Sequence, residues 1–301
     1  MDSEAGSLAK LTFAVGITTM ENRGEFGTLR TLMSLKNLSL IVLLCLPAAA
    51  AAQTADEIVT KVLAARGGVE RIKAVRSQRI SGTINFGGGA QGPFLVELKR
   101  PGKMHIEVTI QGQTLVRSYD GKSAGWVINP FGEKKGVQLM SAEDISNIAD
   151  ESDFDGPLMD YKEKGNRVEL AGKEEVDGQL AYRLKLTSAK GETRSYLFDA
   201  GNFHLVRWEG TRKVGDKDVP WESMFRDYRE VDGLLFAYEI DSDAPGTEQS
   251  QKIIADKIEV DPKIDESRFG KPVPPSTPQA RGPEAPPETG PPPSSPPSPQ
   301  N

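Results

Sequence analysis

Apolar and polar residues alternate with a period of two along much of the chain. The clearest runs are residues 80–86, 94–98, 104–110, 180–186 and 236–240, in which every second residue is apolar or glycine. This period is typical of β-strands with one apolar and one solvated face. Asp177-Gly178 and Asp232-Gly233 supply the positive φ angles of tight hairpins. The pattern predicts a mainly β fold of about ten strands joined by short links, and therefore an antiparallel meander.

A helical pattern precedes the strands. Thr54 and Glu57 have the spacing of a capping box, in which each side chain satisfies a free backbone amide of the first turn. Apolar residues at 58, 59, 62 and 63 then follow helical spacing, and Gly67-Gly68 ends the helix. Residues 69–75 extend it by another turn or two. We expect an amphipathic helix that lies on the sheet.

Residues 141–161 interrupt the meander. Ser141 and Asp144 have the spacing to cap a short helix that carries Ile145 and Ile148. A helical excursion with one apolar side, placed inside a long meander, indicates a plug or lid. Two short helices cannot cover the apolar face of about ten strands, so the face either closes into a packed barrel or encloses a cavity.

The inward residues of the first long strands and of the lid are the candidate cavity lining for an acyl chain. The sequence does not separate residues that line a void from residues that pack under the helix. The candidates are Ile84, Phe94, Val96, Leu98, Met104, Ile106 and Val108 on the strands, with Ile145, Ile148, Phe154 and Leu158 on the lid.

The N-terminal 52 residues are predicted to be removed from the mature protein. Residues 1–32 are interpreted as an over-extended start, and residues 33–52 as a secretory signal peptide: a basic Lys36, an uncharged run at 38–46 and alanines at 48–52 before Gln53. The run is shorter than the roughly 20 residues of a membrane span. The alternative is a cytosolic protein with a buried apolar helix. Export predicts a periplasmic, cell-envelope location.

The last 31 residues form the other expected non-folded segment. Thirteen of the 21 prolines lie between residues 272 and 301, among small and polar residues. Such a segment buries too little apolar surface to offset its ordering entropy, so residues 271–301 are predicted to be a disordered tail. Residues 53–270 remain as one β-rich domain.

The composition excludes several classes of function. The net charge of −6 and the lack of a basic block argue against a nucleic-acid partner. The single cysteine, Cys45, lies in the predicted signal peptide, and Leu44 before it disfavours a lipoprotein cleavage site. Disulfides, thiol catalysis and cysteine-ligated metals are therefore not expected.

No motif indicates catalysis, a cofactor or a metal, so we do not expect an enzyme. His105 and His204 are expected at wet-face or edge positions of strands. Residues 151–156 mimic the start of a calcium loop, but Lys162 stands where a bidentate glutamate is needed, which favours a solvated helix end. Phosphate-loop and nucleophile-elbow motifs are absent from the sequence. A converging carboxylate pair stays open.

Soft β-hairpin motifs over residues 53–272 resemble the LolA/LolB-like group, and within it the outer-membrane lipoprotein-sorting proteins. The motifs follow the helix that ends in Gly67-Gly68. They are Tyr119-Asp120-Gly121, Trp126 to Phe131, Asp155 to Leu158 with Tyr161, Val168 to Gly172, Val176 to Gly178, Ala181 to Leu186, Tyr196 to Asp199, Asp227-Tyr228, Val231 to Gly233 and Phe269 to Pro272. The resemblance implies an open antiparallel half-barrel with a helical lid over an apolar cavity that holds acyl chains.

The resemblance also implies a periplasmic carrier or binding protein, with an acylated lipoprotein or lipid as partner, handover proteins at the inner and outer membranes, and a monomeric state. A carrier's lid-locking arginine corresponds to Arg76, Arg79 or Arg183, between which the sequence does not choose. The proline-rich tail departs from the family. Alternative functions are a sensor or interaction domain that binds an envelope protein, a hydrolase, and a structural β protein with a packed core.

Overall fold

The computed structural model describes residues 53–273 except 215, 216, 246 and 248. The predicted signal peptide and most of the predicted tail therefore lie outside the described residues. The strands, in chain order, are β1 Ser77–Phe86, β2 Gln91–Lys99, β3 Lys103–Ile110, β4 Gln113–Tyr119, β5 Gly125–Ile128, β6 Val137–Leu139, β7 Arg167–Val176, β8 Gln179–Thr187, β9 Thr193–Asp199, β10 Leu205–Val214, β11 Lys217–Val231, β12 Leu234–Asp243 and β13 Ser250–Val260.

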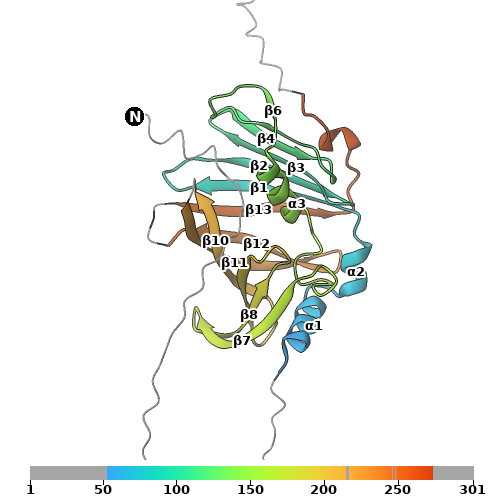
Figure 1. Ribbon diagram of the computed structural model, residues 1–301, viewed down its shortest axis with the longest axis vertical. Helices are drawn as coiled ribbons and strands as arrows, with labels where there is room; N and C mark the ends of the chain where they lie inside the picture. The colour runs from blue at the N-terminus through green and yellow to red at the C-terminus, as the bar shows by residue number, and fades with distance from the viewer. Residues whose placement is uncertain (1–52, 215–216, 246, 248, 274–301) are drawn as a thin grey trace, which may run out of the picture.

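All of these strands belong to one sheet, in the order β6-β5-β4-β3-β2-β1-β13-β12-β11-β10-β9-β8-β7 (Figure 1). The chain starts in the middle at β1, runs out to β6, resumes at the opposite edge with β7 and returns to β13 beside β1. Edge strands β6 and β7 do not pair, so the sheet is an open antiparallel half-barrel, as expected. It has 13 strands rather than about ten. Four-residue β5 and three-residue β6 are too short to show alternation.

The hairpin turns have the predicted backbone. Asp177 and Gly178 have φ of 49° and 80°, and Asp232 and Gly233 have φ of 50° and 73°. Two successive positive φ angles define the type I′ turn, whose twist matches that of the flanking strands. These turns fix the register of β7 with β8 and of β11 with β12.

Three α-helices accompany the sheet in the described part of the chain: α1 Ala55–Ala65, α2 Val69–Ala74 and α3 Ala142–Glu151. Both predicted capping boxes are present, with Thr54 and Glu57 at the start of α1 and Ser141 and Asp144 at the start of α3. Figure 1 shows α1 beside β7 and α3 in front of β1–β3. The helices therefore cover separate parts of the concave face.

Two apolar clusters form beneath these helices. The larger one joins α1 and α2 to residues of β7–β9 and to Leu158, Met159 and Tyr161. In the smaller one, Ile148 of α3 is fully buried against Leu98, Met104 and Tyr119. We call residues 141–161, which contribute to both clusters, the lid segment.

The outer face of β1–β4 is covered by the C-terminal residues 261–270, which end in the 3-10 turn η2 (Glu266–Phe269). Glu97, at 3% exposure, accepts hydrogen bonds from Arg79 and Arg268 at 2.8 and 2.7 Å. The prediction that His105 is solvent-exposed was wrong, because this cover reduces its exposure to 3%. Its ring nitrogens contact Ser118 Oγ and Glu107 Oε1, each at 2.9 Å.

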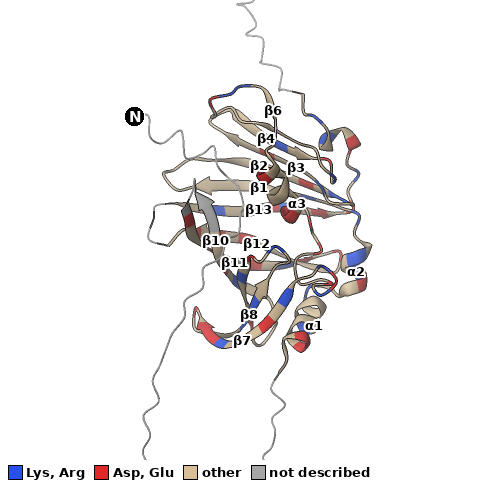
Figure 2. Cartoon of the chain, in the orientation of Figure 1, with Lys and Arg blue, Asp and Glu red and all other residues tan. Residues whose placement is uncertain are grey.

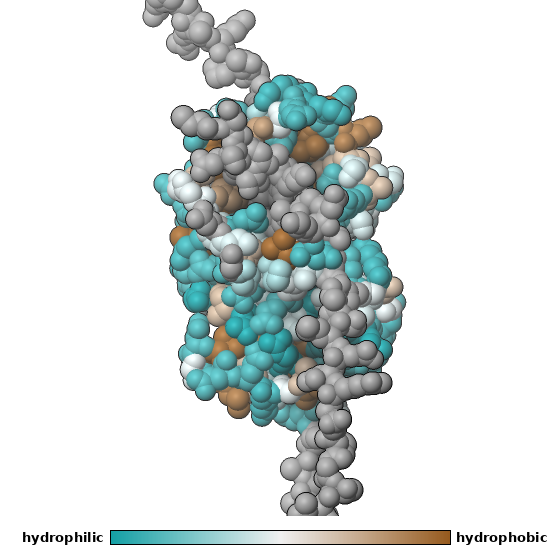
Figure 3. Space-filling model, turned by 60° about the vertical axis from the view of Figure 1, so that its left-hand side comes forward, coloured by the Kyte–Doolittle hydropathy of each residue, from teal (hydrophilic) through white to brown (hydrophobic). Residues whose placement is uncertain are grey.

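The described surface carries charges of both signs, interspersed over the strands (Figure 2). The face in Figure 3 is mainly hydrophilic with small apolar patches. No helix in the described ranges is long and apolar enough to span a bilayer.

Residues 261–270, which cover the outer face of β1–β4, give the first prediction. Phe269 is 2% exposed, so Phe269→Ala is expected to lower the free energy of unfolding by about 3–5 kcal/mol.

Deleting residues 272–301 is expected to leave the melting temperature nearly unchanged, because that segment lacks an apolar anchor. Chemical denaturation and thermal melts of both variants check this. A truncation that melted several degrees lower than the full chain would contradict the assignment of the tail as non-folded.

Candidate functional site

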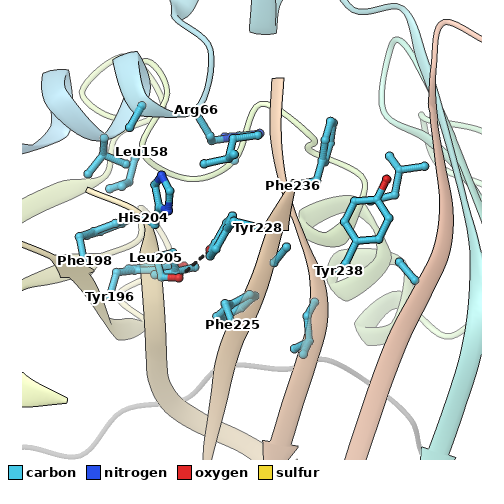
Figure 4. A pocket seen from close by; sticks show the side chains of 18 of the residues that line it. Arg66, Leu158, Tyr196, Phe198, His204, Leu205, Phe225, Tyr228, Phe236 and Tyr238 are labelled. Atoms are coloured by element: carbon cyan, nitrogen blue, oxygen red, sulfur yellow. Dashed lines mark hydrogen bonds between the residues drawn. The ribbon is translucent and has the colours of Figure 1, made fainter. Parts of the chain in front are cut away.

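The described residues enclose two adjoining cavities of several hundred Å³ on the concave face. The first has a volume of about 410 Å³ and lies between the end of α1, the lid segment and strands β9–β13, with β1 and β2 at one side. Figure 4 shows aromatic side chains from several strands pointing into it. Its aromatic lining consists of Phe94, Tyr196, Phe198, Phe203, Phe225, Tyr228, Phe236 and Tyr238.

The second cavity has a volume of about 320 Å³ and lies over β1–β4. Its wall is almost entirely aliphatic and aromatic, with Arg117 and Glu151 as its charged members. Phe94, Val96 and Ile253 line both cavities, so the two spaces share one wall. Each volume lies within the roughly 300–1,000 Å³ of ligand pockets.

Three arginines attach the lid segment to the rest of the fold. Arg66, at the end of α1, donates to the carbonyl oxygens of Asp155 and Phe154 at 2.7 and 2.8 Å. Arg100 donates to both carboxylate oxygens of Asp155, at 2.5 and 2.8 Å. Arg117 donates to Glu151 at 3.1 Å. The three arginines predicted as candidates for locking the lid, Arg76, Arg79 and Arg183, lie elsewhere.

Of those candidates, Arg79 pairs with Glu97 on the outer face, and Arg183 pairs with Glu174 and Glu209. The backbone amide of Arg76 donates to Asp261. The arginines that hold the lid had no distinguishing pattern in the sequence. Their role becomes visible only when residues about 90 positions apart, such as Arg66 and Asp155, meet in space.

Glu151 and Asp155 are largely buried in ion pairs, with 12% and 17% of their side chains exposed, so the prediction of a solvated helix end was wrong for these two residues. The Arg100 guanidinium holds the pKa of Asp155 below its usual value, against the opposing effect of burial. Lys164 pairs with Asp153 at 2.5 Å. Among the described residues there is no group of three or more potential metal ligands.

His204 lies at the first cavity, in the turn before β10, rather than on a wet face. Its ring packs against Tyr228, with 4.8 Å between centroids, and burial lowers the pKa of its imidazole. The Tyr228 hydroxyl donates to the Leu205 carbonyl at 2.6 Å, the dashed line in Figure 4. Burial also raises the pKa of this hydroxyl.

Burial lowers the pKa of Arg66, which lines the first cavity beside these groups. Figure 4 shows Arg66, His204 and Tyr228 on one side of the cavity. The first cavity therefore combines an extended apolar wall with a small polar end.

The structure separates the predicted lining residues into two sets. Phe94 and Val96 line both cavities, and Leu158 lines the first. Ile84, Met104, Ile106 and Val108 line the second cavity. The residues of the other set pack in the apolar cluster beneath α3 and line neither cavity: Leu98, Ile145, Ile148 and Phe154.

The sequence reasoning missed most of the first cavity. Phe236, Tyr238 and Ile240 were recognised as one face of a strand, but nothing in the sequence placed β12 and β13 beside β1. Arg66 and His204 were missed as well. The closing of the first strand onto the last is a long-range pairing that alternation does not encode.

No family model and no curated protein matches this sequence. Solved structures that it resembles include a putative outer membrane lipoprotein-sorting protein domain from Vibrio parahaemolyticus, with 12% identity, a TM-score of 0.48 and coverage of 71% of this chain and 95% of that one. A LolA superfamily protein from Nitrosomonas europaea has 15% identity and a TM-score of 0.46, covering 73% and 99%. A DUF1329 family protein from Desulfovibrio piger has 14% identity and a TM-score of 0.47, and the match covers 72% of this chain and 97% of that one.

The latch at Asp155 gives the second prediction. Because the pKa of Asp155 is depressed in the folded state, its ion pair stabilises the protein above about pH 4 and is lost as the pH falls through the folded pKa. Asp155→Asn is expected to cost roughly 1–3 kcal/mol at pH 7 and to remove this pH dependence. Hydrogen exchange is expected to quicken in residues 142–161.

Asp150→Asn is the matched control. Asp150 also pairs with a cation, Lys190, but both side chains are about half exposed, at 60% and 48%. Its change is expected to stay within about 0.5 kcal/mol. Equal losses in the two variants, or unchanged exchange in the lid segment of Asp155→Asn, would show that Asp155 is not a latch.

Proposed function

We propose that the protein is a carrier or binding protein for a ligand that bears an acyl chain, such as a lipid or an acylated lipoprotein. The observation that carries this proposal is the pair of adjoining apolar cavities under a separately attached lid. A protein with only a structural role gains nothing from such spaces, because unfilled apolar volume lowers stability.

The energetics of acyl binding are consistent with a carrier. Each buried methylene contributes about 0.8 kcal/mol, so a 16-carbon chain contributes roughly 12 kcal/mol before the costs of association. These costs amount to at least several kcal/mol. Enclosed hydrocarbon contact alone therefore supports reversible binding, which a protein that releases its cargo requires. Motion of the lid segment would then control access.

The proposal includes export to the cell envelope, from the signal-peptide pattern at residues 33–52. An envelope carrier of acyl chains exchanges its cargo with membranes or with handover proteins. An acylated lipoprotein and a free lipid present the same hydrocarbon to the cavities, and native mass spectrometry of the protein taken from an envelope extract identifies which one it carries.

The third prediction tests the cavities. Ile106 and Val108 line the second cavity and are only part-buried, so an aspartate at either position can remain hydrated. Ile106→Asp and Val108→Asp are expected to fold and to lose most of their affinity for a fluorescent fatty acid. Displacement titrations measure the affinity, and circular dichroism checks the fold.

Two variants calibrate this test. Leu98→Asp places an unpaired charge in the packed cluster under α3 and is expected to prevent folding. Leu180→Asp, at a position that is 51% exposed, is expected to change neither fold nor affinity. A wild-type protein without affinity for the acyl probe, or unfolding of Ile106→Asp and Val108→Asp alike, would refute the carrier proposal.

The fourth prediction concerns export. The exported protein is expected to begin at or near Gln53, because the alanines at 48–52 form a signal-peptidase site. Edman sequencing or intact-mass measurement of the protein from a periplasmic fraction checks this. An N-terminus upstream of residue 33, or a lipid on Cys45, would contradict it.

A further inference from the structure

We propose that the first cavity binds the anionic end of its ligand through Arg66 and His204, so that the cargo is an acyl chain that carries an oxyanion, a carboxylate or a phosphate. This inference rests on the proposed function and adds the chemical class of the ligand's polar group. It follows from a difference between the two cavities: the arginine of the second cavity is paired with a carboxylate, whereas the arginine of the first is bonded only to backbone carbonyls.

In the second cavity the cation is already compensated. Arg117 donates to the carboxylate of Glu151 at 3.1 Å, and the two side chains are 11% and 12% exposed. A close, buried pair of this kind leaves little net charge toward the cavity. This space is suited to hydrocarbon.

In the first cavity Arg66 is the one charged side chain among the described lining residues. Its hydrogen bonds go to two backbone carbonyls, and no carboxylate accepts from it. The nearest carboxylates serve other cations: Asp155 pairs with Arg100, and Asp153 pairs with Lys164. A guanidinium has five donors, and those that do not reach the carbonyls remain for a ligand.

A desolvated cation with only carbonyl partners favours an incoming anion, since a charge in an apolar site is costly until it is paired. A guanidinium is also suited geometrically, because its parallel N–H groups match the two oxygens of a carboxylate or phosphate.

His204 provides a second donor at the same end of the cavity. It lines the first cavity with Arg66, and in the part of the chain that the structure describes its ring nitrogens have no hydrogen-bond partner. The charged and titratable groups around it are Arg66, Tyr228 and Asp199. The Tyr228 hydroxyl is committed to Leu205, and Asp199 accepts from the amides of Gly201 and Asn202.

The anion would therefore lie at the Arg66 end, with its hydrocarbon extending over Phe94 and Val96 toward the second cavity. These two residues form the wall that the cavities share. The arrangement orients the ligand, because only one end of the combined space carries an uncompensated cation.

Matched ligands test this inference by displacement of a fluorescent acyl probe at pH 7.5. Dodecanoate and dodecanol have the same chain and differ in charge. The wild type is expected to bind dodecanoate at least about tenfold more tightly, equivalent to about 1.4 kcal/mol. Arg66→Gln is expected to reduce this preference to about twofold or less. Arg71→Gln is the control, because Arg71 also donates to a backbone carbonyl, that of Asp232, but at the surface.

A measurement on the wild type keeps the test decisive if Arg66→Gln does not fold. The chain has two histidines, so NMR follows each ring separately, with His204→Gln to assign them. Burial lowers the pKa of His204 in the free protein. A bound anion stabilises the imidazolium, so dodecanoate is expected to raise this pKa and dodecanol is not.

The outcomes separate the two proposals. Equal binding of acid and alcohol, or an unmoved His204 pKa, overturns the anion site and leaves the carrier function standing. Failure of both ligands to bind overturns the carrier function and this inference with it. A His204 pKa that rises with inorganic phosphate alone, as much as with dodecanoate, would identify a free-anion site and overturn the assignment to an acyl ligand.

Discussion

A single sheet of 13 strands has one continuous apolar concave face, and the chain contains few residues to cover it. Within the described residues nearly all connections are short, so the cover of this face comes from residues 54–76 before β1 and residues 140–166 between the two edge strands. The first segment packs over β7–β9, and the lid segment packs partly there and partly over β2–β4. The cavities lie at the margins of these two segments, which line them only in part. They form because the apolar face of the sheet is larger than the area that these two segments cover.

The lid segment is attached by both apolar and polar contacts. Ile148 and Met159 anchor the lid segment in the two apolar clusters, and Arg66, Arg100 and Arg117 add hydrogen bonds beside the cavities. Hydrogen bonds exchanged with water cost little net free energy, roughly 0.5–1.5 kcal/mol each, or 1.5–3 where a charge takes part. The polar attachments can therefore be exchanged with water at little cost, whereas the apolar contacts of Ile148 and Met159 resist opening.

Local features of this fold could be read from the sequence, whereas long-range pairings could not. The capping boxes at Thr54 and Ser141 and the turns at Asp177 and Asp232 depend on neighbours within four residues, and all four were predicted correctly. The pairing of β1 with β13 joins residues 165–182 positions apart, and it brings Ile80 together with Ile253, Ala255 and Ile258 at one wall of the first cavity. For this reason the predicted lining residues belong to β1–β3 and the lid, while the polar end at Arg66 and His204 was missed.

His105 was expected to be exposed and is buried, and the reason for this shows how the two faces of the sheet differ. Period-two alternation distinguishes apolar from polar side chains, but a polar side chain is solvated only if nothing lies over it. Residues 261–270 lie over β1–β4 and are held by polar contacts of Glu97, Glu107 and Arg268. The Glu107 pKa is depressed, mainly by its hydrogen bond from His105, which keeps this carboxylate ionised to accept them. Strands β1–β4 are thus covered outside by this network, while their inner face packs partly under α3 and partly lines the second cavity. This outer cover stiffens the wall of the second cavity, so we expect a ligand to enter by moving the lid segment rather than by spreading the strands.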